Sequence, residues 1–346
     1  NSTKKVLKHS NFILGPELKK FENNFSNFLK SRFAIGTSNG TAALYLALKY
    51  LKLSQKDEVI TVSNAYLATV SSIVLAGGKP VLVDVDDTLN ISTEDIKKKI
   101  NKNTKAIMPV HLTGSPCNME KILRIVKNKK IFVIEDCAQA VGAKIKNKFV
   151  GTFGDIGCFS FHPLKNLSGL GDGGAITCKS NRIKEWILKA RNNGHPHRDE
   201  CNFWSLNMRL DTLQASFLGE KLKYVLNINR KRNINAEIYY KELRYVKQLK
   251  LPTINKNNYH AFHLFVVLAE KRNALKKFLE KNNVETKIHY PKPVHLQSIG
   301  RKYFKKTRLI NTESFSKRIL SLPINQYLSK NEILKICRLI KKFYNN

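Results

Sequence analysis

"TKAIMPVHLTGSPCNMEKILRIVKNKKIFVIED", residues 104–136, predicts two buried strands joined by one helix. The apolar runs at 104–111 and 131–136 are short and rich in β-branched residues, whereas the apolar residues of 119–127 recur at helical spacing. Two strands of this kind pair in parallel through a right-handed crossover, and helices cover both faces of the sheet that they build. The stretch therefore predicts an α/β fold.

The same alternation continues on both sides of this unit, from Thr41 to about Cys178. Ser92 or Thr93, followed by acidic residues, gives one of the further helices a capping-box start. Helices are expected at 41–51, 67–77 and 92–100, and further strands at 57–62, 80–85 and 155–161. We therefore predict a large domain with a mainly parallel sheet flanked by helices.

The pattern changes after about Arg209. Residues 210–243 form one helical stretch with few breakers, which predicts a connection between two lobes. Beyond it, strands are expected at 260–269 and 284–290 and helices at 272–282 and 329–344. We accordingly predict a large domain over residues 1–225 and a smaller C-terminal α+β domain over residues 226–346.

The chain is strongly basic, with 61 Lys and Arg against 26 Asp and Glu and a net charge of +35. Such a charge can indicate a nucleic-acid partner. The basic residues are mostly lysines spread along the whole chain, without an arginine- and aromatic-rich cluster that would read bases. We therefore expect no nucleic-acid partner, and only a positive field that attracts a phosphorylated substrate.

The sequence also bears on location. No apolar run approaches the ~20 residues that cross a bilayer, so no membrane association is expected. The cysteines are scattered without a CxxC pair, which predicts reduced, buried thiols and a cytoplasmic protein, and we predict no metal site. The six are Cys117, Cys137, Cys158, Cys178, Cys201 and Cys337.

Two expected strand ends carry groups that could hold a ligand, as strand carboxyl ends do in open α/β sheets. The stretch GTSNGTAAL (36–44) leads from small residues into a helix N-terminus, where free N–H groups favour a phosphate. Taken alone, an ordinary N-cap loop explains it better. Asp136 ends an apolar strand, and its buried carboxylate needs either a cationic ligand nitrogen or a neighbouring Lys or Arg. Gln139 follows one turn later and could bind the same ligand.

A single lysine stands within the small-residue stretch SFHPLKNLSGLGDGGA (160–175). Lys165 lies in a sharp bend between two apolar runs, close to Ser160 at the end of the first. A lysine amine attacks carbonyl groups once its pKa is lowered. This lysine, the phosphate-binding helix start and Asp136 together match the needs of pyridoxal phosphate, and Tyr66 is placed to stack on the cofactor ring.

These residues bring the chain close to a known family. The sequence resembles the DegT/StrS family of nucleotide-sugar aminotransferases nearly from end to end, which implies the aspartate-aminotransferase type of fold, the pyridoxal-phosphate-dependent transferase fold type I. The lysine block and the EDCAQ motif are the most specific parts of the resemblance. The blocks lie at 12–29, 36–44, 80–86, 89–92, 109–119, 133–143, 151–167, 170–176, 207–215, 289–297 and 320–324.

The resemblance implies a role for individual residues. Lys165 matches the lysine that holds the cofactor aldehyde as a Schiff base, and Asp136 matches the partner of the pyridine nitrogen. Gln139 matches the residue bonded to the cofactor's phenolic oxygen. The remaining matches are Gly40, Thr41 and Ser160 for the phosphate, Tyr66 for ring stacking, and Asn207 for a phosphate contact from the partner subunit of a homodimer with shared active sites.

The resemblance also implies a reaction, with L-glutamate as the amino donor, 2-oxoglutarate as its product and a nucleotide-linked keto sugar as the acceptor. Position 3 of a TDP-linked keto-6-deoxyhexose is favoured, and position 4 of a UDP- or GDP-linked keto sugar is the alternative. Two other classes stay open, a pyridoxal-phosphate-dependent sugar dehydratase and a non-catalytic binding protein. Family members that are dehydratases carry histidine at the lysine position, and Lys165 argues against that branch.

Some segments depart from the family. Residues 191–207 lie where family members have a variable, substrate-facing segment. Arg209 is either an anion contact or part of a structural ion pair, and we favour the ion pair. For His289, Tyr290 and His295, roles in strands and loops and roles in sugar binding are equally supported.

Overall fold

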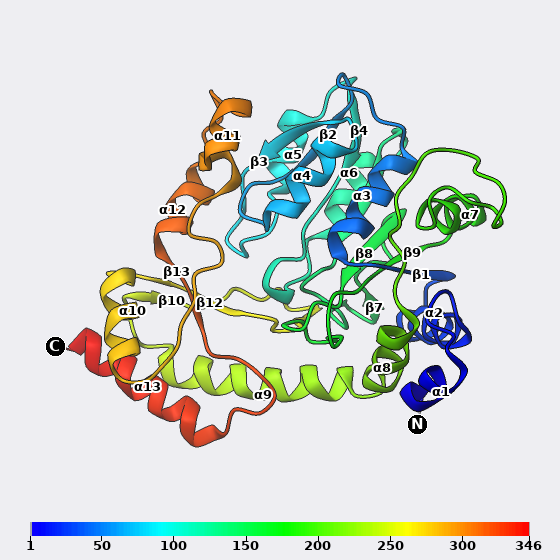
Figure 1. Cartoon of the computed structure of the whole chain (residues 1–346). Coiled ribbons are helices and arrows are strands. Elements are labelled where there is room, and N and C mark those ends of the chain that lie inside the picture. Colours follow the sequence, from blue (N-terminus) through cyan, green and yellow to red (C-terminus); the bar gives the residue numbers. More distant parts are fainter. Residues whose placement is uncertain (1, 346) are drawn as a thin grey trace.

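The structure, a computed structural model, describes residues 2–345, so the outermost residue of each predicted domain lies outside the described residues. A seven-stranded sheet forms the centre of the first lobe, in the order β1-β9-β8-β5-β4-β2-β3 (Figure 1). Its strands are β1 Phe33–Thr37, β2 Glu58–Val62, β3 Lys79–Val83, β4 Thr104–Ile107, β5 Phe132–Asp136, β8 Ile156–Ser160 and β9 Gly174–Cys178. Strand β9 pairs antiparallel with both neighbours, and the other four pairings are parallel.

Both faces of this sheet are covered by helices, as the apolar strands require. One face packs on α3 Gly40–Tyr50, α4 Leu67–Leu75 and α7 Asn181–Ala190, and the other on α5 Thr93–Lys99 and α6 Met119–Val126. Neighbouring strand residues divide between the faces, since Ile134 belongs to the first core and Val133 to the second. The predicted α/β fold with a mainly parallel sheet is therefore confirmed.

A third apolar cluster extends the core toward the N-terminal helices. Here α1 Ser2–His9 and α2 Pro16–Leu29 pack against α8 Thr212–Leu222. Phe25 of α2 contacts Phe159 of β8 edge to face, with 5.1 Å between ring centroids. This packing fixes the strand that leads into the lysine loop.

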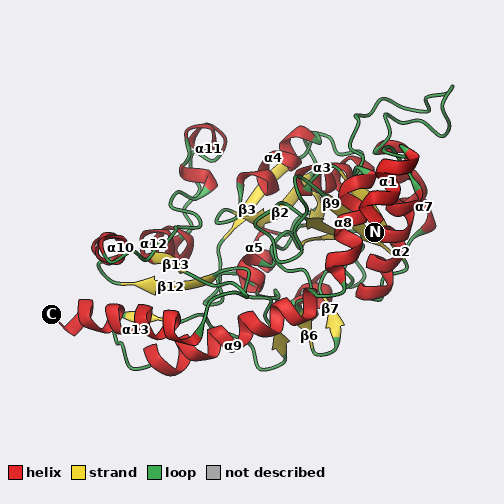
Figure 2. Ribbon diagram, turned by 60° about the horizontal axis from the view of Figure 1, so that its bottom comes forward, coloured by secondary structure: helices red, strands yellow, loops and turns green. Residues whose placement is uncertain are grey.

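The connection between the lobes is two helices rather than the single one predicted for residues 210–243. Helix α8 ends at Leu222 and α9 Val225–Leu243 begins three residues later, in a new direction (Figure 1). Neither Lys223 nor Tyr224 is a helix breaker, so tertiary packing sets this break. Figure 2 shows α9 running beside the C-terminal helix α13 Lys330–Asn345.

The smaller lobe is built on a three-stranded antiparallel sheet, β10-β12-β13. Its strands are β10 Leu249–Lys250, β12 Phe265–Ala269 and β13 Ile319–Leu322, and its helices are α10 Arg272–Lys281, α11 Ser298–Tyr303, α12 Ile310–Arg318 and α13. Tyr239 of α9 and Ile333 of α13 are buried in its core. The strand predicted at 284–290 is wrong, because this segment is extended but forms only one β-bridge, from Lys287 to Ser321.

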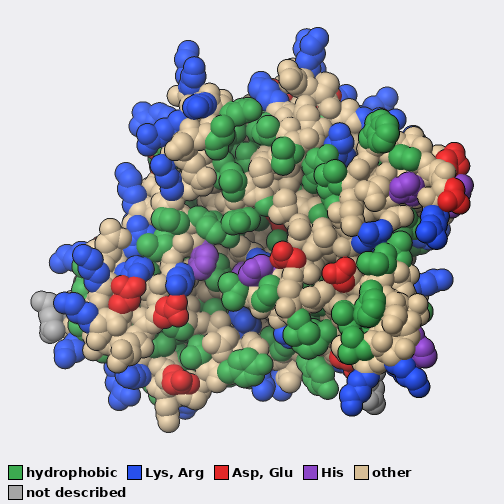
Figure 3. All heavy atoms as spheres, in the orientation of Figure 1, with side chains coloured by type: hydrophobic (Ala, Val, Ile, Leu, Met, Phe, Trp, Pro, Cys, Tyr) green, Lys and Arg blue, Asp and Glu red, His purple; other side chains and the backbone are tan. Residues whose placement is uncertain are grey.

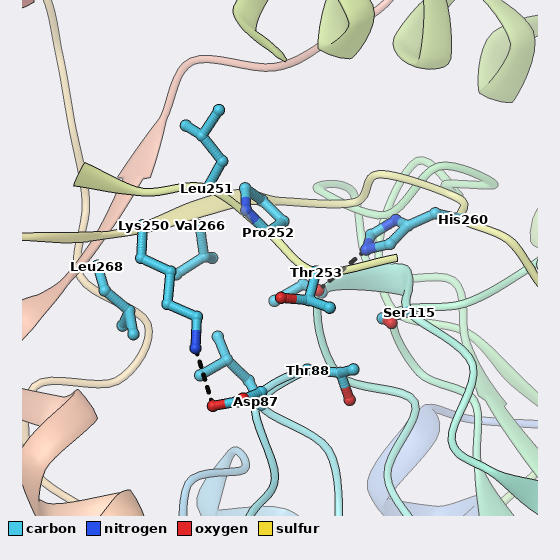
Figure 4. A pocket seen from close by; sticks show the side chains of 12 residues that line it. Asp87, Thr88, Ser115, Lys250, Leu251, Pro252, Thr253, His260, Val266 and Leu268 are labelled. Carbon is cyan, nitrogen blue, oxygen red and sulfur yellow. Dashed lines mark hydrogen bonds and ion pairs between the residues drawn. The ribbon is translucent and has the colours of Figure 1, made fainter. Parts of the chain in front are cut away.

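Several contacts join the two lobes. The segment after β10 returns to the large lobe, where β11 Asn258–Tyr259 pairs with β6 Lys144–Ile145, itself paired with β7 Lys148–Phe149. Lys250 and Asp87 form an ion pair of 2.8 Å beside a cavity of about 20 Å³, which His260 also lines (Figure 4). A space of this size holds about one water molecule and no larger ligand.

Three further observations bear on the predictions about charge, membrane association and cysteines. Lys and Arg side chains are spread around the visible face rather than gathered in one patch (Figure 3). No described helix is long and apolar enough to cross a membrane. All six cysteines are free, but Cys201 is exposed, so its predicted burial is wrong.

Candidate functional site

The predicted site residues gather at the carboxyl edge of the large sheet. Asp136 and Ser160 are the last residues of β5 and β8, which are neighbouring parallel strands. Helix α3 starts three residues after β1, and Tyr66 precedes α4 after β2. Parallel strands deliver their carboxyl ends to the same edge, so groups from four parts of the chain meet there.

The start of α3 forms a cradle of free backbone N–H groups. The side chain of Asn39 caps the helix by accepting a hydrogen bond from the amide of Ala42, at 2.8 Å. The amides of Gly40 and Thr41, in the first turn, are left for a ligand. A Cβ atom on Gly40 would lie 2.8 Å from the Cβ of Ser160, so glycine is needed for this close approach. Ser160 thus places its hydroxyl beside the helix start.

Asp136 is a buried carboxylate that accepts hydrogen bonds from two donors. Only 3% of the residue is exposed. Its Oδ2 accepts a hydrogen bond from the Thr69 hydroxyl at 2.9 Å, and its Oδ1 accepts one from the amide of Ala138 at 3.1 Å. Within residues 2–345, no Lys, Arg or His nitrogen lies within 4.0 Å of it, so the structural ion pair considered above is not formed. Burial raises the pKa of Asp136, which leaves a carboxylate in need of a cationic partner.

Lys165 faces this carboxylate from the loop after β8. Burial lowers the pKa of the Lys165 amine to about 8, although the charge of Asp136 acts in the opposite direction. The neutral amine is therefore much more abundant near neutral pH than in a surface lysine, and it is the form that attacks carbonyl groups. Lys165 also lines a cleft of about 890 Å³ between the lobes, large enough for a bound substrate.

The cleft is bounded by both lobes. The lysine loop forms one wall, and the segment around His289 and the loop after β13 form the opposite wall. Figure 3 shows the molecule hollowed between the lobes on the face drawn there. His289 is half-buried and hydrogen-bonds with the Ser321 hydroxyl at 2.9 Å. Burial, with the charges of Lys165 and Lys287, lowers the pKa of His289, which keeps the imidazole neutral.

Tyr66, Gln139 and Tyr290 form one cluster at this edge. The rings of Tyr66 and Tyr290 lie 5.9 Å apart at a tilt of 46°. The Gln139 side-chain amide donates to the Tyr290 hydroxyl at 3.3 Å and accepts from the amide of Thr113 at 2.7 Å. Tyr66 is 62% exposed, so its face is available to a ring. The small lobe thus contributes Tyr290 beside two of the predicted cofactor residues.

His295 differs from His289 and Tyr290, the other two candidate sugar contacts. It is 2% exposed, and its ring nitrogens contact the Ser63 hydroxyl at 2.7 Å and the Glu313 carboxylate at 3.2 Å. The backbone amides of Val294 and His295 also donate to Ser63. Ser63 and His295 are both buried, so neither the hydroxyl nor the imidazole has access to a substrate. Its geometry favours the structural role, a clamp between the lobes.

Asn207 and Arg209 precede α8. Asn207 is exposed and forms an isolated β-bridge with Asn192. Arg209 donates to the side-chain oxygen of the same Asn192 at 2.8 Å. The favoured ion pair of Arg209 is wrong, since no carboxylate lies within 4.0 Å of it in the part of the chain that the structure describes. The uncharged Asn192 side chain is the partner of the guanidinium instead of a carboxylate.

Sequence reasoning missed Thr69 and Glu135. Glu135 is fully buried and accepts hydrogen bonds from His111 and from three amides of the 151–154 turn. His111 accepts from the amide of Cys117 through Nδ1, so Nε2 carries the proton that it donates to Glu135. His111, Glu135 and Cys137 place their ligand atoms within 4.8 Å of one another, but the first two are occupied by these hydrogen bonds. The alternation of side chains along a strand could have indicated that Glu135 points away from Asp136.

The residues at the sheet edge fit pyridoxal phosphate by the chemistry of their groups. Lys165 supplies an amine of lowered pKa, Asp136 a buried carboxylate without a cation, and the start of α3 an anion cradle. The cradle has no room for a side chain at Gly40. A ligand that approaches the backbone closely would also require glycine at this position. Each requirement of the cofactor thus has a matching group on this chain.

Comparisons with known proteins agree with this arrangement. Residues 1–341 match the model of the DegT/DnrJ/EryC1/StrS aminotransferase family. The chain is 39% identical to a dTDP-3-amino-3,6-dideoxy-alpha-D-galactopyranose transaminase of Aneurinibacillus thermoaerophilus, over 98% of this chain and 93% of that protein. It is 36% identical to the GDP-perosamine synthase of Escherichia coli O157:H7, over 96% and 91% of the two chains.

A solved structure is similar over its whole length. The structure of S. venezuelae DesV in complex with a ketimine intermediate matches with a TM-score of 0.96 and 31% identity, covering 100% of this chain and 94% of that one. This similarity confirms the predicted fold, and the family confirms the predicted cofactor. The chain belongs to the pyridoxal-phosphate-dependent DegT/DnrJ/EryC1/StrS aminotransferase family, and the similar proteins named here are sugar aminotransferases.

Proposed function

We propose that this chain transfers an amino group from L-glutamate to a nucleotide-linked keto sugar and releases 2-oxoglutarate. The observation that carries the proposal is the pairing of Lys165, whose amine has a lowered pKa, with the cation-free carboxylate of Asp136. A sugar-binding protein without catalysis would need neither group. Pyridoxal phosphate, when bound, supplies an aldehyde and an electron-withdrawing ring that stabilises negative charge on the neighbouring carbon.

Lys165 has two tasks in this proposal. Its Nζ would hold the cofactor aldehyde, and once a donor amine has freed it, the same amine would serve as the general base that accepts and returns a proton. A pKa of about 8 suits both tasks, because the amine is partly neutral at neutral pH and still basic enough to take a proton. The cleft between the lobes admits each substrate to this amine in turn.

Asp136 and the start of α3 hold the two ends of the cofactor. The Asp136 carboxylate keeps a proton on the ring nitrogen, and its isolation from other cations leaves it free for that contact. The amides of Gly40 and Thr41, with the hydroxyls of Thr41 and Ser160, receive the phosphate. These residues would hold the phosphate and the ring nitrogen of the cofactor.

The remaining residues are assigned to contacts with the ring face, the phenolic oxygen and the sugar. Tyr66 stacks on the ring, and the Gln139 amide, which now donates to Tyr290, donates to the phenolic oxygen. His289, which lines the cleft, and Tyr290, which lies beside Gln139, are assigned to the sugar from the small lobe. His295, which the sequence also offered as a sugar contact, is assigned to the clamp with Ser63.

For the acceptor we propose position 3 of a TDP-linked keto-6-deoxyhexose. The support is the 39% identity to the Aneurinibacillus thermoaerophilus transaminase that makes a dTDP-linked 3-amino-3,6-dideoxy sugar. The alternative, position 4 of a UDP- or GDP-linked sugar, is supported by the similarity to GDP-perosamine synthase. Either product is an amino sugar for a surface glycan such as the O-antigen of lipopolysaccharide.

We further propose that the enzyme is a cytoplasmic homodimer with shared sites. Asn207 is exposed at the start of the segment that leads into α8, so it is available to a neighbouring subunit. A two-fold interface would build two equivalent sites. The free thiols support a reducing compartment.

The experiment is a panel of keto-sugar nucleotides incubated with the purified enzyme, pyridoxal phosphate and L-glutamate. We expect a product mass that shows replacement of the keto oxygen by an amine with the TDP-linked 3-keto sugar, and 2-oxoglutarate in equal amount. Amination of a UDP- or GDP-linked 4-keto sugar alone would select the alternative. Loss of water from the sugar without 2-oxoglutarate would contradict amino transfer altogether.

A further inference from the structure

Thr69 occupies a position that the assignment of cofactor residues leaves unexplained. It lies in the first turn of α4, is 1% exposed and donates its hydroxyl to Asp136 at 2.9 Å. A serine or threonine hydroxyl in a helix normally bonds a nearby carbonyl of its own helix. Here it bonds the end of another element, the strand β5.

The same helical turn carries Tyr66. The backbone carbonyl of Tyr66 accepts a hydrogen bond from the amide of Thr69, at 3.1 Å. Tyr66 is the residue proposed to stack on the cofactor ring, and Asp136 the residue proposed to contact the ring nitrogen. One turn of α4 therefore connects the group on the face of the ring to the group at its edge.

The carboxylate has few other partners. Oδ1 accepts from the amide of Ala138, and Thr69 is the partner of Oδ2 among the described residues. A carboxylate can rotate about its Cβ–Cγ bond more freely once the single donor to one of its oxygens is lost. The orientation of Asp136 toward a ligand nitrogen thus depends on Thr69.

We propose that Thr69 is a positioning residue, which holds the Asp136 carboxylate ionised and aimed at the ring nitrogen of pyridoxal phosphate. This inference rests on the proposed role of Asp136. An O–H donor stabilises the charged form of a carboxylate, so Thr69 opposes the effect of burial.

Other titratable groups surround the carboxylate and act with Thr69. Lys165 stabilises its charge, whereas burial opposes it. Asp136 in turn contributes to the raised pKa values of groups on other elements, namely Tyr290, Cys117, Cys137 and Cys158. Thr69 differs from all of these because it contacts Asp136 through a hydrogen bond that a single substitution removes without changing charge.

The test uses the holoenzyme loaded with pyridoxal phosphate labelled with ¹⁵N in the ring. Thr69→Val keeps the shape of the side chain and removes the donor. We expect its ¹⁵N resonance to move toward that of unprotonated pyridine and kcat to fall roughly 10- to 100-fold, the size expected for a lost hydrogen bond to a charged group. Thr69→Ser should restore both, and Thr69→Ala should reproduce the loss if Thr69→Val does not fold.

Thr61→Val is the matched control. Thr61 on β2 is also fully buried, and its hydroxyl donates to the carbonyl of Met108 at 2.8 Å. Strand β4 lies between β2 and the strand of Asp136. We expect its ¹⁵N resonance to equal that of the wild type. A Thr69→Val enzyme with an unmoved resonance, whether its rate falls or not, would overturn the proposal. A wild-type protein that binds no labelled cofactor at Lys165 would instead contradict the proposed function.

Discussion

Glu135 and Asp136 are neighbours on one strand, and they occupy two opposite regions of the large lobe. Glu135 accepts four hydrogen bonds, from His111, Gly151, Phe153 and Gly154. Asp136 accepts two, from Thr69 and Ala138, and its charge has no cation within 4.0 Å in the described chain. Both carboxylates are almost fully buried.

The difference shows how two buried carboxylates on one strand take a structural role and a binding role. On the Glu135 side, the protein supplies all the donors, and the carboxylate ties the turn 151–154 to β5. On the Asp136 side, the protein leaves the carboxylate under-coordinated, which costs stability unless a ligand completes it. A buried acid with too few partners is therefore the better indicator of a binding site.

The largest effect is expected for Lys165, the cation that faces the Asp136 side. Lys165→Ala should lower kcat by at least about 10⁴-fold, because both cofactor attachment and proton transfer lose their group. Lys221→Ala is the control, since Lys221 lines the same cleft but hydrogen-bonds Ser168. The rate of 2-oxoglutarate release measures both, and equal losses in the two variants would remove the special place of Lys165.

A second variant tests the Asp136 side directly. Asp136→Asn should lower kcat roughly 10²- to 10⁴-fold, on the scale of a lost electrostatic partner. Removal of an unpaired buried charge should leave the cofactor-free protein at least as stable as the wild type. Steady-state rates and urea unfolding give the two values, and near-normal turnover would show that Asp136 is not the nitrogen partner.

The titration of Lys165 provides a test without substitution. In the cofactor-free protein its pKa should lie at about 8 rather than 10.5, because burial disfavours the ammonium form. The folded state then binds fewer protons than the unfolded one between these values, so the lysine's contribution to folding stability rises with pH from about 8 to 10.5. Labelling of Lys165 with an amine reagent, followed by mass spectrometry, should show its midpoint near pH 8. A midpoint like that of surface lysines would contradict its burial.

Glu135→Gln should behave in the opposite way to Asp136→Asn. Its amide nitrogen would face donors instead of accepting from them, and stability should fall by about 3 kcal/mol, the size of a lost charged hydrogen bond. The rate of the folded enzyme should change much less than in Asp136→Asn. Urea unfolding measures the loss, and a stable but inactive Glu135→Gln would reverse the roles given to the two carboxylates.

The smallest effect is expected at the phosphate cradle. A Cβ on Gly40 would lie 2.8 Å from the Cβ of Ser160, so Gly40→Ala must push the helix start and the strand end apart. Overpacking of this kind costs about 1–3 kcal/mol, and we expect cofactor affinity to fall roughly 10-fold. Gly219→Ala in α8 is the control, because its new Cβ would meet no atom within 4 Å. Cofactor titration by absorbance distinguishes the two.

Much of this site could be predicted from the sequence, because strand ends can be located from apolar runs. Asp136, Ser160 and the start of α3 follow from that rule, and Lys165 follows from the bend after β8. Thr69 could not be predicted, since its contact with Asp136 depends on how α4 packs against the sheet. The clamp of His295 on Ser63 joins residues 232 positions apart and carries no local signal.

The errors in the fold have the same cause. The break between α8 and α9 occurs at Lys223 and Tyr224, which favour no particular turn, and only the packing of two lobes requires it. Residues 284–290 alternate like a strand, but they lie against Ser321 with a single β-bridge. Local pattern therefore predicted which segments are regular, whereas contacts between lobes decided where they end. The domain division at residue 225 stays a prediction.

The central claim is that one amine, that of Lys165, carries the cofactor. The direct measurement is reduction of the holoenzyme with borohydride, digestion with trypsin and location of the phosphopyridoxyl group by mass spectrometry. Modification blocks cleavage after Lys165, so we expect the label on a single peptide spanning residues 149–179. A label on any other of the chain's lysines, or one divided among several, would contradict it.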